Sequence, residues 1–101
     1  MSADDEKIEI ENVNTPGKIT RVNRAKYEAM REALLAVLPR GAPGATVAEA
    51  KVALLPHLPD AHFPAGKTAG WWLKGVQLDL EAKGIIARAN TKPLRLYRVG
   101  Q

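Results

Sequence analysis

The sequence contains no cysteine, which excludes disulfides, thiolate nucleophiles and thiolate zinc sites together. Its only serine is Ser2, close to the first residue, so the chain offers no serine nucleophile beside a catalytic base. These absences suit a protein of the reducing cytoplasm. We expect a cytoplasmic protein that is not an enzyme and that uses no cofactor.

Long hydrophobic runs are also missing. No apolar stretch approaches the roughly 20 residues that a helix needs to cross a bilayer. The chain starts with the acidic segment MSADDEKIEIE, whereas a signal peptide starts basic and then becomes apolar. We therefore expect no membrane partner and no export.

At 101 residues the chain has the size of one small domain, and its net charge of +4 is unevenly distributed. Residues 1–12 sum to −4, so the rest of the chain carries +8, and from Lys83 onward there are five basic residues and no acid. Such a concentration attracts phosphate backbones. It equally suits a solvated edge strand that positive charges protect against pairing with other chains.

The first part of the chain predicts an acidic tail and an extended arm over residues 1–23. Residues 1–7 have the composition of a disordered segment. The following IEIENVN alternates apolar and polar side chains and ends at the turn signal Thr15-Pro16-Gly17. KITRV is a second short extended piece, and Asn23 is placed to cap a helix. The folded domain is then expected over residues 24–101.

Three helices are predicted in that domain. The first runs from Arg24 to Leu38 on an apolar stripe and ends at Pro39. The second starts at a capping box formed by Thr46 and Glu49 and stops near Pro56. The third covers residues 67–83 and is followed by Gly84, a residue suited to a left-handed helix end. Residues 85–99 then give two β-prone runs separated by Asn-Thr-Lys-Pro, which predicts a hairpin.

Three helices followed by a hairpin are the element order of a winged helix-turn-helix domain, an α+β fold. Four segments also carry a family resemblance: IENVNTPGKITRV, YEAMREALLAVLP, PHLPDAHFPAGKTAGWWLKGVQLDLEAKGII and KPLRLYR. Together they cover nearly the whole chain, which resembles a family of small uncharacterised bacterial winged-helix-like proteins. The resemblance implies the fold and leaves the function open.

The two adjacent tryptophans of the third helix point about 100° apart, so one stripe cannot bury both. Trp72 falls on an apolar stripe that we predict to be core. Trp71 starts a second, narrower strip that continues through Gly75 and Leu78. Either the predicted hairpin of residues 85–99, which we call the wing, or the arm covers Trp71 and Leu78. Otherwise the two residues form an exposed interface for a second copy or another protein.

We carry two hypotheses for function. In the first, the third helix enters the major groove of double-stranded DNA, where Lys67 and Lys74 contact phosphate or guanine and Gln77 reads an adenine edge. The wing would add backbone attraction through four cations, Arg88, Lys92, Arg95 and Arg98. In the second, the Trp71 and Leu78 strip serves protein interaction or self-association without DNA. The acids of the third helix, Asp79 and Glu81, weigh against the first.

Two further patterns receive ordinary structural interpretations. AGKT at residues 65–68 resembles the end of a phosphate-binding loop, but Ala61 stands where the earlier glycine is required and no strand precedes it. His57, Asp60 and His62 are metal-ligand types in one loop. Because prolines interrupt them, we interpret them as surface or capping groups and predict no metal site.

Overall fold

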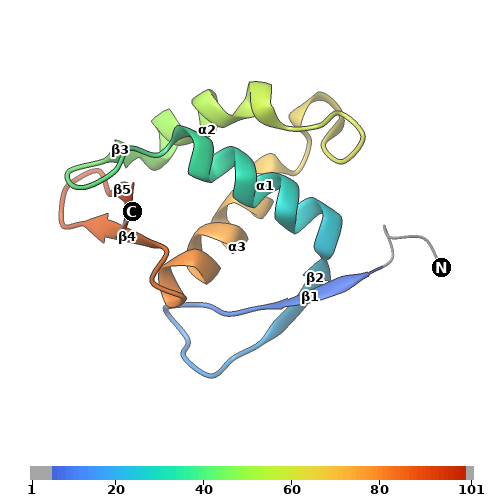
Figure 1. Cartoon of the computed structure of the whole chain (residues 1–101), viewed down its shortest axis with the longest axis horizontal. Helices are drawn as coiled ribbons and strands as arrows, with labels where there is room; N and C mark the ends of the chain where they lie inside the picture. The colour runs from blue at the N-terminus through green and yellow to red at the C-terminus, as the bar shows by residue number, and fades with distance from the viewer. Residues whose placement is uncertain (1–5, 100–101) are drawn as a thin grey trace.

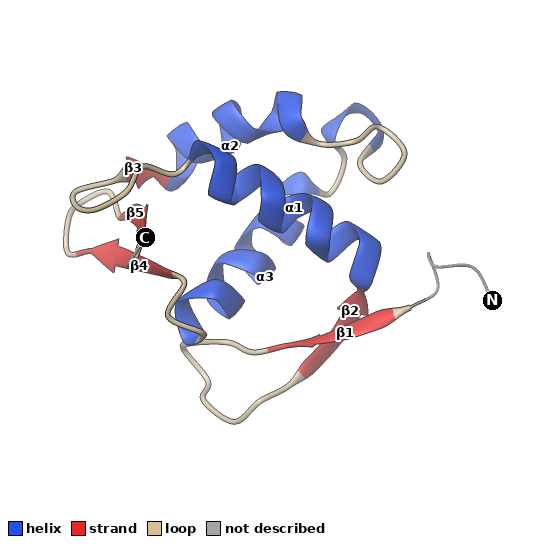
Figure 2. Ribbon diagram, viewed as in Figure 1, coloured by secondary structure: helices blue, strands red, loops and turns tan. Residues whose placement is uncertain are grey.

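The computed structural model describes residues 6–99, so the disorder predicted for residues 1–5 lies outside the described residues. Three helices lie between two small sheets at opposite ends of the molecule (Figures 1 and 2). The elements in chain order are β1 (Lys7–Ile10), β2 (Thr20–Asn23), α1 (Arg24–Val37), β3 (Ala45–Thr46), α2 (Val47–Leu54), α3 (Ala69–Ala82), β4 (Ile86–Ala89) and β5 (Arg95–Arg98). The α+β class is therefore confirmed.

The first helix forms as predicted. The Asn23 side chain accepts a hydrogen bond from the Lys26 amide at 2.9 Å, which caps α1. The apolar stripe of the helix is buried, and Met30 and Leu34 are fully inaccessible. The helix ends one residue earlier than predicted, because Leu38 is extended, as is usual before a proline.

The capping box of the second helix is also confirmed. The Glu49 amide donates to the Thr46 hydroxyl, and the Glu49 carboxylate accepts from the Thr46 amide. The strand β3, directly before α2, was not predicted. It pairs antiparallel with β5, giving a three-stranded sheet in the order β3-β5-β4. Gly44 permits this pairing, since a β carbon there would lie 2.0 Å from the carbonyl oxygen of Leu96.

The third helix begins at Ala69, two residues later than predicted. Thr68 adopts a left-handed backbone with φ of 62°, and its hydroxyl donates to the Lys67 carbonyl instead of capping the helix. At the other end Gly84 has φ of 73°, so the predicted helix end is confirmed. Two short 3-10 turns, Leu55–His57 and Pro64–Gly66, connect α2 to α3.

The predicted hairpin is confirmed as the antiparallel pair β4 and β5. The arm, residues 6–23, forms a separate hairpin in which β1 and β2 pair with each other, so it adds no strand to the other sheet. Ile10 and Val22 of the arm are buried in the same core as the helices. Within residues 6–99, each helix is too short or too polar for a bilayer crossing.

Candidate nucleic-acid interface

The two tryptophans have opposite environments. Trp72 is 9% exposed and belongs to the core, as predicted, whereas Trp71 is 62% exposed. The two rings meet edge to face with centroids 5.1 Å apart and planes at 76°. Trp72 makes a similar contact, at 6.3 Å, with the buried Phe63. A chain of aromatic contacts therefore runs from the core to the exposed indole.

The strip expected to join Trp71 to Leu78 is divided in the structure. Leu78 is only 8% exposed, because the arm packs against this side of α3. A β carbon at Gly75 would lie 3.9 Å from the Cδ1 of Ile10 in β1, so the missing side chain leaves room for the arm. The arm thus covers Leu78 and leaves Trp71 exposed. The prediction of an exposed interface that contains Leu78 is therefore wrong.

A groove of about 290 Å³ lies between Trp71 and the arm. Its apolar floor includes Ile10 and Leu78, and Thr20 of β2 adds a hydroxyl. The remaining lining residues are Glu11, Asn12, Gly70, Lys74 and Gly75. The groove places the exposed indole beside apolar surface with polar groups at its margin.

A second groove, of about 430 Å³, lies on the other side of the exposed surface of α3. It brings together three cations from different elements: Lys51 of α2, Lys74 of α3 and Arg88 of β4. Gly70 and Lys74 line both grooves, so the two adjoin along the first turns of α3. We call this surface, defined by Lys51, Gly70, Trp71 and Lys74, the α3 outer face.

Lys51 was not among the predicted site residues. Its Nζ lies 3.4 Å from the position that a β carbon on Gly70 would occupy, so α2 holds this lysine directly beside the start of α3. The available signal was weak: an exposed lysine on a short helix whose alanines allow close packing against α3.

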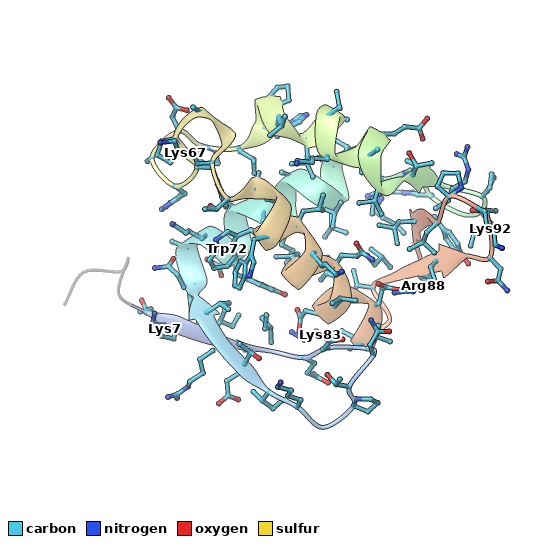
Figure 3. All side chains as sticks on the ribbon, turned by 180° about the vertical axis from the view of Figure 1, so that it is seen from behind. Lys7, Lys67, Trp72, Lys83, Arg88 and Lys92 are labelled. Atoms are coloured by element: carbon cyan, nitrogen blue, oxygen red, sulfur yellow. The ribbon has the colours of Figure 1, made fainter. Side chains whose placement is uncertain are left out.

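Of the predicted nucleic-acid residues, Lys67, Lys74 and Lys92 are exposed. No hydrogen bond or ion pair joins their side chains to another residue within the part of the chain that the structure describes. Figure 3 looks onto this side of α3 and shows Lys67 near the start of the helix and Lys92 at the far end of the wing. The exposed lysines therefore follow the length of the molecule.

The prediction that Gln77 faces water or a base is wrong. Its side chain is 7% exposed, and its amide donates to Glu81 at 3.0 Å. Glu81 in turn accepts a hydrogen bond from Arg88 of β4, and the distance from Nη2 to Oε2 is 2.9 Å. The wing closes over this part of α3, which a helical wheel for the isolated helix could not show.

The three arginines of the wing are held by the fold. Arg88 is paired with Glu81, Arg95 donates to the Gly44 carbonyl at 3.0 Å, and Arg98 donates to the Leu38 carbonyl at 3.1 Å. These hydrogen bonds leave the hairpin arginines with fewer free donors than the composition of the hairpin suggested.

Asp79 has a role that the sequence did not reveal. It is fully buried and accepts hydrogen bonds from the Glu11 amide of the arm at 2.9 Å, from the Tyr27 hydroxyl of α1 and from Lys83 at 2.9 Å. Burial, followed by the hydrogen bond to Asp79, raises the pKa of Tyr27 above its usual range. One carboxylate thus ties the arm to two helices and sets its position beside the α3 outer face.

The three candidate metal ligands are not assembled. His57 and Asp60 are exposed and His62 is half-buried. Within residues 6–99, no group of three or more histidine, aspartate or glutamate side chains has an arrangement that could hold a metal ion.

Residues 7–96 match the model of a family described as "Family of unknown function (DUF6958)". No curated protein and no solved structure matches the chain.

Proposed function

The chain belongs to the DUF6958 family of unknown function, and from this premise we propose that it is a winged-helix domain that binds nucleic acid through its α3 outer face. The proposal takes the protein as a binding domain and not as an enzyme. It assigns the main contacts to phosphate groups.

The order of elements supports the winged-helix assignment. The chain runs α1, β3, α2, α3, β4, β5, and β5 lies between β3 and β4 in the sheet. This places a hairpin wing directly after the third helix, the arrangement that DNA-binding winged helices use. The connection between α2 and α3, residues 55–68, is longer than the usual short turn.

The grouping of Lys51, Lys74 and Arg88 around one groove carries the functional proposal. The described residues that line this groove include no carboxylate, although Glu81 partly neutralises Arg88 from behind. Lys51 and Lys74 are exposed and make no ion pair with other described residues. Two free ammonium groups from neighbouring helices form a suitable site for a phosphate backbone.

The same surface has little capacity to read base edges. With Gln77 buried, the exposed first turns of α3 present Gly70, Trp71 and Lys74. Of these, only Lys74 can contact a base edge, at guanine, and no residue is left to read adenine. The arm also lies along one side of α3 (Figure 1). We therefore expect binding that depends strongly on salt and weakly on sequence.

Fluorescence polarisation with labelled oligonucleotides tests this function. At about 50 mM salt the wild-type protein should bind with a Kd in the micromolar range or below. Lys51→Gln and Lys74→Gln should each weaken binding several-fold and lower the slope of log K against log salt by about 1.

The matched control is Lys18→Gln, which removes the same charge from an exposed residue of the arm that lines neither groove. Its binding should stay within about twofold of wild type if location matters. Absence of wild-type binding to both single-stranded and duplex oligonucleotides would reject the function. Equal losses in all three variants would reject the site.

A further inference from the structure

We propose that the ligand of the α3 outer face is single-stranded nucleic acid, with an unpaired base stacked on Trp71 and the neighbouring phosphates at Lys51 and Lys74. This inference rests on the nucleic-acid binding proposed above and names the class of nucleic acid.

Trp71 is held in a defined orientation although it is exposed. Its edge-to-face contact with Trp72, which is itself fixed against Phe63, restrains the indole. At 62% exposure the ring still offers most of its surface to solvent. A restrained, accessible indole loses little conformational entropy when a base stacks on it.

The helix sequence keeps the surroundings of the ring open. Gly70 precedes Trp71, and Gly75 lies one turn beyond it, so neither neighbour has a side chain that could cover the indole. The groove of about 290 Å³ beside the ring has an apolar floor and is near the lower end of the size range for small-ligand sites. Asn12 and Thr20 at its margin supply groups for hydrogen bonds with a base edge.

The positive charges of Lys51 and Lys74 favour a nucleic-acid strand as the ligand of the α3 outer face. Lys74 lines both the groove beside Trp71 and the cationic groove, so a base site and a phosphate site adjoin on one helix. A single strand presents unstacked bases and phosphates along the same chain. A duplex keeps its bases stacked inside, and only its ends could reach the indole.

The charges also disfavour a second copy of the chain on this surface. A symmetric dimer through Trp71 would bring Lys67 and Lys74 of one protomer toward the same lysines of the other. With Leu78 covered by the arm, Trp71 is the one large apolar side chain exposed on the described residues of α3. The apolar area for a stable dimer is therefore small, and the like charges oppose it.

The test compares binding of a single-stranded oligothymidylate and of a duplex of equal length by wild type, Trp71→Ala and Trp71→Phe. The wild type should prefer the single strand. Trp71→Ala should lose about tenfold or more in single-strand affinity with little change for the duplex, and Trp71→Phe should retain most of the affinity. Binding of the single strand should also quench the emission of Trp71 in the wild type.

Because the ring is exposed, Trp71→Ala should unfold at nearly the wild-type temperature, which separates a lost contact from a lost fold. If the wild type binds neither oligonucleotide, the proposed function fails together with this inference. If it binds and Trp71→Ala weakens both ligands equally, or neither, only the single-strand inference fails. Sedimentation showing a micromolar dimer that Trp71→Ala dissociates would also overturn it, in favour of self-association.

Discussion

At the scale of single residues, the buried carboxylate of Asp79 explains how an exposed arm can have a fixed position. A charge in the interior is tolerated only when it is paired and its oxygens accept hydrogen bonds. Lys83 supplies the charge, and the Tyr27 hydroxyl and the Glu11 amide supply hydrogen bonds. Any change to this cluster should affect the arm and both helices together.

The raised pKa of Tyr27 makes a pH-dependent prediction. Its pKa is higher in the folded protein than in the unfolded chain, where it is near 10, so the unfolded chain loses the proton first as the pH rises. The stabilisation is therefore complete below about pH 10 and is lost above it. Urea unfolding at pH 8 to 11 should show a wild-type advantage over Tyr27→Phe that shrinks with rising pH. Parallel pH profiles for the two proteins would contradict the role given to this hydroxyl.

The burial of a residue was predictable from the sequence only where it depends on the position of that residue in a single helix. Trp72 follows the apolar stripe of α3 and is buried as its position on the helix requires. Gln77 lies on the polar side of the same helix and is nevertheless buried. The reason is that the wing packs against this side of α3, where Glu81 accepts hydrogen bonds from both Gln77 and Arg88. Such contacts depend on segments far apart in the sequence, which periodicity cannot place.

At the scale of elements, α2 is short, and its capping box supports its first turn. Hydrogen bonds from the Thr46 amide and hydroxyl lower the pKa of Glu49, with a smaller contribution from the charge of Arg95. The ionised carboxylate is thus favoured in the folded state. This matters for the candidate site because α2 carries Lys51.

A prediction for the stability of α2 follows from the lowered pKa of Glu49. The contribution of Glu49 to stability is present above about pH 4.5 and is lost as the pH falls further. Glu49→Gln should therefore unfold at a lower temperature than wild type at pH 7, and the difference should be smaller at pH 3.5. Thr46→Ala, which removes the hydroxyl of the cap, should cost about 1 kcal/mol at pH 7. If the difference in unfolding temperature between wild type and Glu49→Gln is the same at both pH values, the charge of Glu49 does not stabilise the capping box.

Elements with strong local signals were found from the sequence, and those without were missed. Asn23 before α1 and Gly84 after α3 mark helix ends by their own chemistry. The strand β3 consists of only two residues and exists because β5 pairs with it, so nothing local announces it. The late start of α3 was also missed, because the left-handed backbone of Thr68 interrupts a segment whose sequence otherwise suits a helix.

At the scale of the whole molecule, the fold pairs some charged side chains and leaves others exposed. Two acids of the arm pair with nearby arginines, Glu6 with Arg24 and Glu9 with Arg21, whereas Glu11 lines the groove beside Trp71. Among the described residues, exposed lysines without an ion pair occur in the arm, at Lys7 and Lys18, as well as in α2, before and within α3 and at Lys92. Lys51 and Lys74, on the two helices, differ from the others because they line one groove together. The sequence left open whether the basic hairpin attracts phosphate or is a solvated edge strand. Because the fold engages the hairpin arginines internally, the lysines of the two helices are the better candidates.

The most direct test of this account is a titration of the ¹⁵N-labelled protein with single-stranded oligothymidylate at about 50 mM salt, followed by amide and indole chemical shifts. The largest changes are expected at the indole N–H of Trp71 and at the amides of Lys51, Gly70 and Lys74. Amides on the exposed side of α1, such as those of Glu28 and Ala36, should not move. Unchanged spectra at saturating oligonucleotide, or changes centred on α1, would contradict the account.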